Sequence, residues 1–204
     1  NWTTFPPMQS TALAPGLLLA APPLGDPNFS KTVVLLAMHS QEGSLGWVIN
    51  GTKVAPVGSL LKKAGLVPEG IELPETPSYD RHARVGGPVS PLSVWALYRR
   101  DDRLDHPEQI VLDNEWAGTG NRTVVEAIAR GEGPREFRLV LGYAGWAPQQ
   151  LDEEIRAGAW LPVAFNAQIV FGQDDDALWE RAYAKMVGIS PLALSQSNFS
   201  AYPK

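Results

Sequence analysis

Two runs of the sequence, VVLLAM at residues 33–38 and RLVLGY at residues 138–143, most constrain how this chain can fold. They are almost uninterruptedly apolar, whereas a strand with one solvent-facing side alternates apolar and polar residues. Such strands need cover on both faces, so we expect a sheet with packed elements on each side. The expected strands are 17–21, 32–38, 45–50, 83–85, 94–98, 109–112, 137–143 and 163–171.

Helix signals are fewer, and they are irregularly placed among the strands. Residues 56–64 and 122–130 each carry apolar residues on one side and stop before a glycine suited to a left-handed C-cap. Two more helices are expected, one starting at Pro148 and one over 175–187. A doubly wound sheet would need a steadier alternation of strand and helix. The sequence therefore predicts a single α+β domain with a mixed, strongly bent sheet packed by a few helices.

The two later helices carry specific expectations. Pro148 suits the first position of a helix, and the acidic residues 152–154 then lie near its positive end, where we expect them to face water. The last helix places Trp179 and Tyr183 on one face, four residues apart. We expect both, together with Trp160, to form one apolar cluster between this helix and the sheet.

Charge and composition exclude several functional classes. The chain carries 17 Lys and Arg against 22 Asp and Glu, and its net charge of −5 disfavours direct nucleic-acid binding. It has no cysteine, which excludes disulfides, thiolate metal sites and iron–sulfur clusters. The histidines His39, His82 and His106 are not spaced as ligand pairs, and the aspartates at 174–176 are typical of a helix cap. We expect no metal and no cofactor.

The start of the chain bears on its location. The apolar run at 16–23 is too short to span a bilayer, and no basic residue precedes it. We therefore expect a cytoplasmic protein without a membrane segment, whose partner is an unknown protein or a small ligand. Residues 1–7 precede the first methionine, Met8, and share no pattern with the rest of the chain. We expect them to be an added or disordered extension, with 8–204 forming one domain.

Polar residues gather around two linked strands. Asp26 and Ser30 precede the strand expected at 32–38, and His39 closes that strand. Asn50 ends the strand expected at 45–50. They form a candidate ligand-binding or catalytic site in which His39 is the acid–base group. The alternative is structural, with a turn at Asp26 and side chains bonded to the backbone. We favour the structural alternative, because a catalytic triad requires a proximity in space that the spacing does not show.

Two glycine motifs, GGPV at 86–89 and GYAGW at 142–146, form a second candidate site. Glycines at strand ends permit close backbone approach and can present backbone amides to a ligand. The alternative is that they bend the sheet while Trp146 fills the core beneath. We expect the motifs to approach each other and flank a pocket with His39 or Asn50 on its rim. The candidate ligand-binding glycines are Gly86, Gly87, Gly142 and Gly145.

Four blocks of sequence resemble the YqgE/AlgH family of bacterial proteins: residues 17–50, GGPV at 86–89, LGYAGW at 141–146 and LWERAYAKMVGI at 178–189. The resemblance covers nearly all of 13–194, and the blocks fall in the family's order. It implies an α+β fold whose bifurcated sheet folds into a pseudo-barrel. One name of the family reflects a proposed role in transcriptional regulation of alginate production. The resemblance brings no settled activity and no established site residues.

Three positions depart from the family's pattern. Thr52 stands where a proline is usual, Tyr98 where a histidine is frequent, and Pro148 where a glycine precedes Gln149. A shared activity that used these positions would be lost here. Two functions remain open. The first is a non-enzymatic binding or regulatory protein, suggested by the lack of a complete catalytic constellation. The second is an enzyme that acts on a small molecule or nucleotide at the polar site described above.

Overall fold

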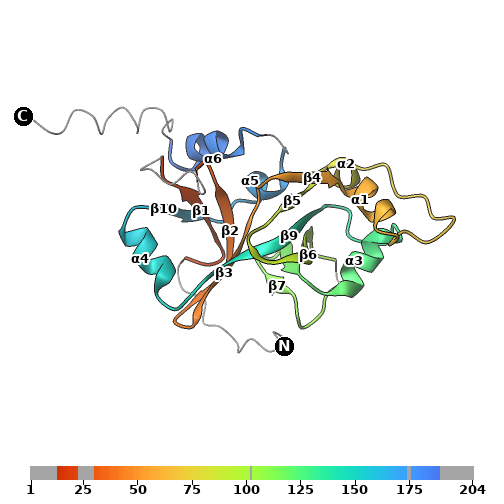
Figure 1. Ribbon diagram of the computed structural model, residues 1–204, viewed down its shortest axis with the longest axis horizontal. Helices are drawn as coiled ribbons and strands as arrows, with labels where there is room; N and C mark the ends of the chain where they lie inside the picture. Colours follow the sequence, from red (N-terminus) through yellow and green to blue (C-terminus); the bar gives the residue numbers. More distant parts are fainter. Residues whose placement is uncertain (1–12, 23–29, 102, 174–175, 189–204) are drawn as a thin grey trace, which may run out of the picture.

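The structure is a computed structural model that describes residues 13–22, 30–101, 103–173 and 176–188 (Figure 1). Its strands are β1 (Gly16–Ala20), β2 (Val33–Ser40), β3 (Gly43–Val48), β4 (Lys53–Pro56), β5 (His82–Val85), β6 (Val89–Arg99), β7 (Ile110–Val111), β8 (Trp116–Thr119), β9 (Phe137–Trp146) and β10 (Trp160–Ala164). Its helices are α1 (Val57–Lys63), α2 (Pro77–Asp80), α3 (Arg122–Ala129), α4 (Gln150–Arg156), α5 (Ala167–Phe171) and α6 (Leu178–Met186). Asp26 and residues 1–7 lie outside the described residues.

Strand β9 lies where the sheet divides. It pairs antiparallel with β6 from Phe137 to Tyr143, parallel with β5 at Val140 and Leu141, and antiparallel with β3 at 144–146. The strand order is β10-β1-β2-β3-β9-β6-β8-β7, with β4 joined to β5 off this path. One parallel pair among antiparallel ones makes the sheet mixed, so the predicted α+β class is confirmed. The path ends at β10 and β7, and the described sheet is bent but not closed.

The uninterrupted apolar strand β2 is covered on both faces, as its sequence predicts. Val33, Leu35 and Ala37 enter a core cluster with α5 and α6, whereas Val34 and Leu36 enter a cluster with α4. All five residues are at most 5% exposed. Figure 1 shows α6 beside β1 and β2, with α4 at one end of the molecule and α1, α2 and α3 at the other. The pleat therefore distributes one apolar run between two cores.

Helix α6 docks on the sheet through two aromatic side chains. The Trp179 Nε1 and the Tyr183 hydroxyl both donate hydrogen bonds to the Ala20 carbonyl oxygen, at 2.9 and 3.0 Å. The prediction that Trp160 shares this cluster is wrong. Trp160 packs in the α4 cluster, with its ring centroid 6.2 Å from that of Trp146. It pairs with Ala20 across β10 and β1, and cross-strand neighbours share a face, which here is the face opposite to α6.

One segment that was expected to be a strand is partly helical. The strand predicted over 163–171 ends at Ala164, and α5 follows it. The Asn166 side chain accepts a hydrogen bond from the Ile169 backbone N–H at 3.2 Å and caps this helix. An apolar run after a capping residue fits a short buried helix as well as a strand, which explains the error. The short elements β4, β8 and α2 were not predicted.

Helices α4 and α6 begin later than expected. Helix α4 starts at Gln150, and Pro148 lies in the turn before it. The cause is Gln149, whose left-handed backbone (φ 66°) interrupts the helical conformation. Helix α6 starts at Leu178, and its expected caps at 174–175 lie outside the described residues.

The two glycine motifs lie against each other, and the contact requires glycine at two positions. Gly142 has φ +70°, and a Cβ there would lie 2.5 Å from the Gly87 carbonyl oxygen. A Cβ on Gly87 would lie 2.2 Å from the Tyr143 carbonyl carbon. Gly145 differs, because its φ is not positive and a Cβ there would have its nearest neighbour at 3.6 Å. The segment after β5 therefore lies directly on β9.

Replacing Trp179 with alanine tests the docking of α6. Truncating a buried tryptophan removes packing and leaves a cavity, so we expect a loss of roughly 3–5 kcal/mol in the free energy of unfolding. Thermal unfolding should show a fall in Tm of roughly 6–20 °C. Tyr183→Phe removes only one of the two hydrogen bonds to Ala20, and it should cost about 1 kcal/mol. An unchanged Tm for Trp179→Ala would contradict the docking described.

A matched pair of variants on β9 tests the backbone contact. Gly142→Ala places a Cβ in a strained conformation against a carbonyl oxygen, so we expect a loss of roughly 2–4 kcal/mol in stability. Gly145→Ala meets no such barrier and should change stability by less than about 0.5 kcal/mol. Urea unfolding of both variants measures the difference. Equal stabilities would show that the contact at Gly142 imposes no constraint.

Candidate functional site

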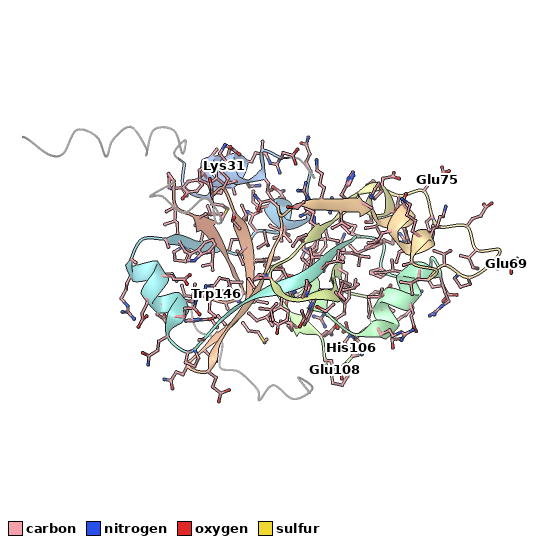
Figure 2. All side chains as sticks on the ribbon, viewed as in Figure 1. Lys31, Glu69, Glu75, His106, Glu108 and Trp146 are labelled. Carbon is pink, nitrogen blue, oxygen red and sulfur yellow. The ribbon has the colours of Figure 1, made fainter. Side chains whose placement is uncertain are left out.

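A pocket of about 600 Å³ opens where the β2–β3 hairpin meets β6 and β9. This volume lies within the usual range for small-molecule sites. Trp146, labelled in Figure 2, belongs to its lining on the side of α4. The lining residues are Met38, Ser40, Glu42, Gly43, Ser44, Leu45, Val89, Ser90, Ser93, Trp95, Tyr143, Gly145, Trp146 and Ala147.

Two aromatic rings form a corner of the pocket. The Trp95 and Tyr143 ring centroids are 5.9 Å apart, and the ring planes meet at 72°. Behind them the fully buried Trp47 packs on Trp95 at 5.3 Å. The Trp95 Nε1 donates to the Ser93 Oγ at 3.2 Å, which helps to fix the indole. The corner is thus supported by the core and by a hydrogen bond.

An irregularity in β6 shapes the neighbouring wall. Val89 pairs with Tyr143, and Val94 pairs with Leu141. Between these pairs β6 therefore has four residues where β9 has one, whereas a regular ladder would have one on each strand. Ser90 adopts a positive φ of 47°, and Leu92 is 91% exposed. The extra residues bulge outward from the sheet. The bulge places Val89 and Trp95 together on the pocket wall although six positions separate them.

The polar side-chain groups of the lining include several hydroxyls and one carboxylate. The Ser40 Oγ donates to the Gly43 carbonyl oxygen at 3.4 Å and accepts from the Glu42 backbone N–H at 3.1 Å, which holds the hairpin turn. The Ser93 Oγ donates to the Ser90 carbonyl oxygen at 2.7 Å. Among the described lining residues, Glu42 alone is charged.

His39 lies beside the pocket, on the other face of β2. Its neighbours Met38 and Ser40 contribute to the lining, and the register shift between Leu36 and Met38 turns His39 to the face of β2 that contacts α4. Its Nδ1 lies 2.7 Å from the Ser44 Oγ, and its Nε2 lies 3.4 Å from the Asp152 Oδ1. The imidazole is 8% exposed. These contacts join β2, β3 and α4 through one side chain.

Asn50 and Ser30 lie far from His39. The Asn50 Oδ1 accepts from the Val33 backbone N–H at 2.8 Å, and its Nδ2 donates to the Lys31 carbonyl oxygen at 2.7 Å. Val33 begins β2 and His39 lies near its end, a separation of roughly 20 Å at the usual rise of a strand. Ser30 is exposed near the Asn50 end. The structure therefore separates the polar residues that the sequence grouped, and Asn50 links two chain segments.

The glycine motifs border the pocket with some of their residues. Gly145 belongs to the lining, whereas Gly86, Gly87 and Gly142 form the backbone contact behind it. Val89 from one motif and Tyr143 from the other form part of the apolar wall of the pocket. Sequence reasoning missed Trp95, because a tryptophan inside a strand usually indicates core.

The three positions that depart from the family's pattern lie outside the lining. The Thr52 carbonyl oxygen accepts from the Val85 backbone N–H at 3.0 Å. The Tyr98 hydroxyl donates to the Gln109 Oε1 at 2.7 Å, and burial raises the pKa of Tyr98 to about 12. Pro148 lies in the turn before α4.

Glu154 of α4 does not simply face water, contrary to expectation. Its Oε2 accepts hydrogen bonds from the Trp146 Nε1 at 2.9 Å and from the Trp160 Nε1 at 2.8 Å. The Gln150 side chain donates to its other carboxylate oxygen at 2.9 Å. Buried indole N–H groups need such partners. One carboxylate therefore fastens α4 to β9 and β10.

Metal-binding clusters and membrane-spanning helices are both absent from the described residues. These residues contain no group of three or more His, Asp or Glu side chains placed to hold a metal ion. None of the helices in this part of the chain has the length and apolar character that spanning a bilayer requires.

Comparison with known sequences finds relatives along almost the whole chain. A family model described as AlgH-like matches residues 17–191. A UPF0301 protein of Anaeromyxobacter dehalogenans is 36% identical over 92% of this chain and 94% of its own length. A UPF0301 protein of Paracoccus denitrificans is 38% identical over 92% of this chain and 96% of its own.

Solved structures show the same fold. The solution structure of the AlgH protein from Pseudomonas aeruginosa matches with a TM-score of 0.69 and 29% identity, over 97% of this chain and all of that one. A crystal structure from Corynebacterium diphtheriae matches with a TM-score of 0.63 and 24% identity, over 91% and 93% of the two chains, and bears on the fold alone. With its sequence, its relatives and its fold in agreement, this chain belongs to the AlgH-like family.

Proposed function

We propose that this protein is a non-enzymatic binding protein that takes a small, largely apolar molecule into the pocket between the β2–β3 hairpin, β6 and β9. The observation that carries the proposal is the aromatic corner of Trp95 and Tyr143 in a pocket of about 600 Å³. Ligand sites are typically concave and apolar, with a few polar groups that orient the ligand. The serines at 40, 90 and 93 supply such groups.

A regulatory role fits this proposal better than direct reading of DNA. The net charge of −5 opposes binding to phosphates, and no basic side chain is found among the described lining residues. A regulator of this kind would bind a small molecule and act through a protein partner. The hairpin that forms one pocket wall also contacts α4 through His39, which offers a route from the ligand to the surface.

One observation favours an enzyme as the second candidate. Ser44, His39 and Asp152 form a chain of polar contacts with the order of a hydrolytic triad. In that chemistry the Ser44 Oγ would attack an ester carbonyl, and its proton would pass to the His39 Nδ1 and then to the leaving alcohol. The binding proposal explains the same contacts as a link between β3 and α4, because His39 is turned away from the pocket.

Filling the pocket from Gly145 tests the binding proposal. A Cβ on Gly145 would lie nearest the side chains of Tyr143 and Val89, at 3.6 and 3.7 Å, so it would enter the pocket without meeting backbone. We expect Gly145→Leu to abolish ligand binding while the Tm of the free protein stays close to that of the wild type.

Thermal-shift screening of small aromatic and aliphatic molecules provides the measurement. A ligand present at a hundred times its Kd stabilises the folded state by about 2.7 kcal/mol, and it should raise Tm by roughly 5–11 °C. Hits that raise the Tm of Gly145→Leu as much as that of the wild type would place their binding elsewhere and contradict the proposal.

A hydrolase assay separates the two candidates. We expect the protein to release p-nitrophenol from acyl esters no faster than Ser44→Ala does, because the His39 imidazole is turned toward α4 and does not line the pocket. Turnover that Ser44→Ala and His39→Gln both abolish, with Tm unchanged, would establish the enzyme and overturn the binding proposal.

A further inference from the structure

We propose that the pocket selects a ligand with an ammonium group on an apolar body. This inference rests on the proposed binding function and names the chemical class of the ligand. It follows from three features of the lining: the aromatic corner, the Glu42 carboxylate, and serine hydroxyls that are left as acceptors.

The aromatic corner suits a cation. The faces of aromatic rings carry negative potential, and an ammonium within about 6 Å of a ring centroid is attracted to them. Trp95 and Tyr143 meet at 72° with centroids 5.9 Å apart, so a group in the angle between them contacts both side chains. Binding sites for substituted ammonium groups use aromatic walls in this way.

The single charge of the lining has the matching sign. Glu42 lies at the tip of the β2–β3 hairpin, and its backbone N–H is held by the Ser40 Oγ at 3.1 Å. Among the described residues its carboxylate forms no ion pair, and the described lining contributes no cation beside it. Because the described lining contains no Lys, Arg or His, an anionic ligand would meet repulsion without compensation.

The hydroxyl groups of Ser40 and Ser93 also favour a ligand with an ammonium group. The Ser93 proton is donated to the Ser90 carbonyl oxygen, and the Ser40 proton to the Gly43 carbonyl oxygen. Each hydroxyl oxygen also accepts one hydrogen bond, and a second lone pair remains on each. The two serines therefore offer acceptors to a ligand, and an ammonium group supplies donors whereas a carboxylate supplies none.

Three probes of one shape test this inference on the full chain: phenethylammonium, 2-phenylethanol and 3-phenylpropionate. At neutral pH the first is a cation, the second is neutral and the third is an anion. Calorimetric titration should rank their affinities in that order, with the ammonium on the order of tenfold tighter than the alcohol. The advantage of the ammonium should shrink as salt is raised.

A pair of charge-removing variants identifies the carboxylate responsible. Glu42→Gln should weaken phenethylammonium by roughly three- to tenfold and leave 2-phenylethanol unchanged. Glu69→Gln is the matched control, because it removes the same charge from an exposed position at the far end of the molecule from Trp146 (Figure 2). It should change neither affinity.

The possible failures are distinguishable. If 2-phenylethanol or 3-phenylpropionate binds as tightly as the ammonium, or if Glu42→Gln has no effect, the ammonium inference is wrong and the binding function stands. If none of the three probes binds and the wider screen gives no ligand that Gly145→Leu excludes, both the inference and the proposed function are overturned.

Discussion

The close approach of the segment after β5 to strand β9 is the constraint on which the rest of the structure depends. The Gly87 carbonyl oxygen lies where a side chain on Gly142 would have to be, so two backbones meet without side chains between them. Strand β9 pairs with all three of β5, β6 and β3, and the sheet divides at this contact. The division leaves the β2–β3 hairpin and the start of β6 apart, and the pocket occupies the space between them.

Much of the fold was predictable because its causes are local. The run 33–38 demands two covered faces whatever surrounds it, and helices α3 and α6 are followed by residues with positive φ at Gly131 and Gly188. The errors arise where the deciding contact is distant or concerns one side chain. The strand expected over 163–171 is divided by the Asn166 cap, and the position of Trp160 follows from its pairing with β1.

The candidate site was less predictable than the fold. The proximity of the two glycine motifs followed from their glycine content and their places at strand ends. The structure does not bring Ser30 and Asn50 next to His39, because residues near one strand in sequence can lie at its opposite ends. Trp95 reaches the pocket through the bulge of β6, and that bulge depends on pairing with β9, which lies much further along the chain. The local sequence pattern around Trp95 does not predict how β6 pairs with a strand so far along the chain.

The carboxylate of Glu154 has a consequence for how the molecule opens. It binds indoles from β9, in the middle of the strand order, and from β10, at its end. Separating α4 from the sheet would break both of these hydrogen bonds at once. We therefore expect helix α4, strand β10 and the last residues of β9 to open as one cooperative unit in native-state hydrogen exchange.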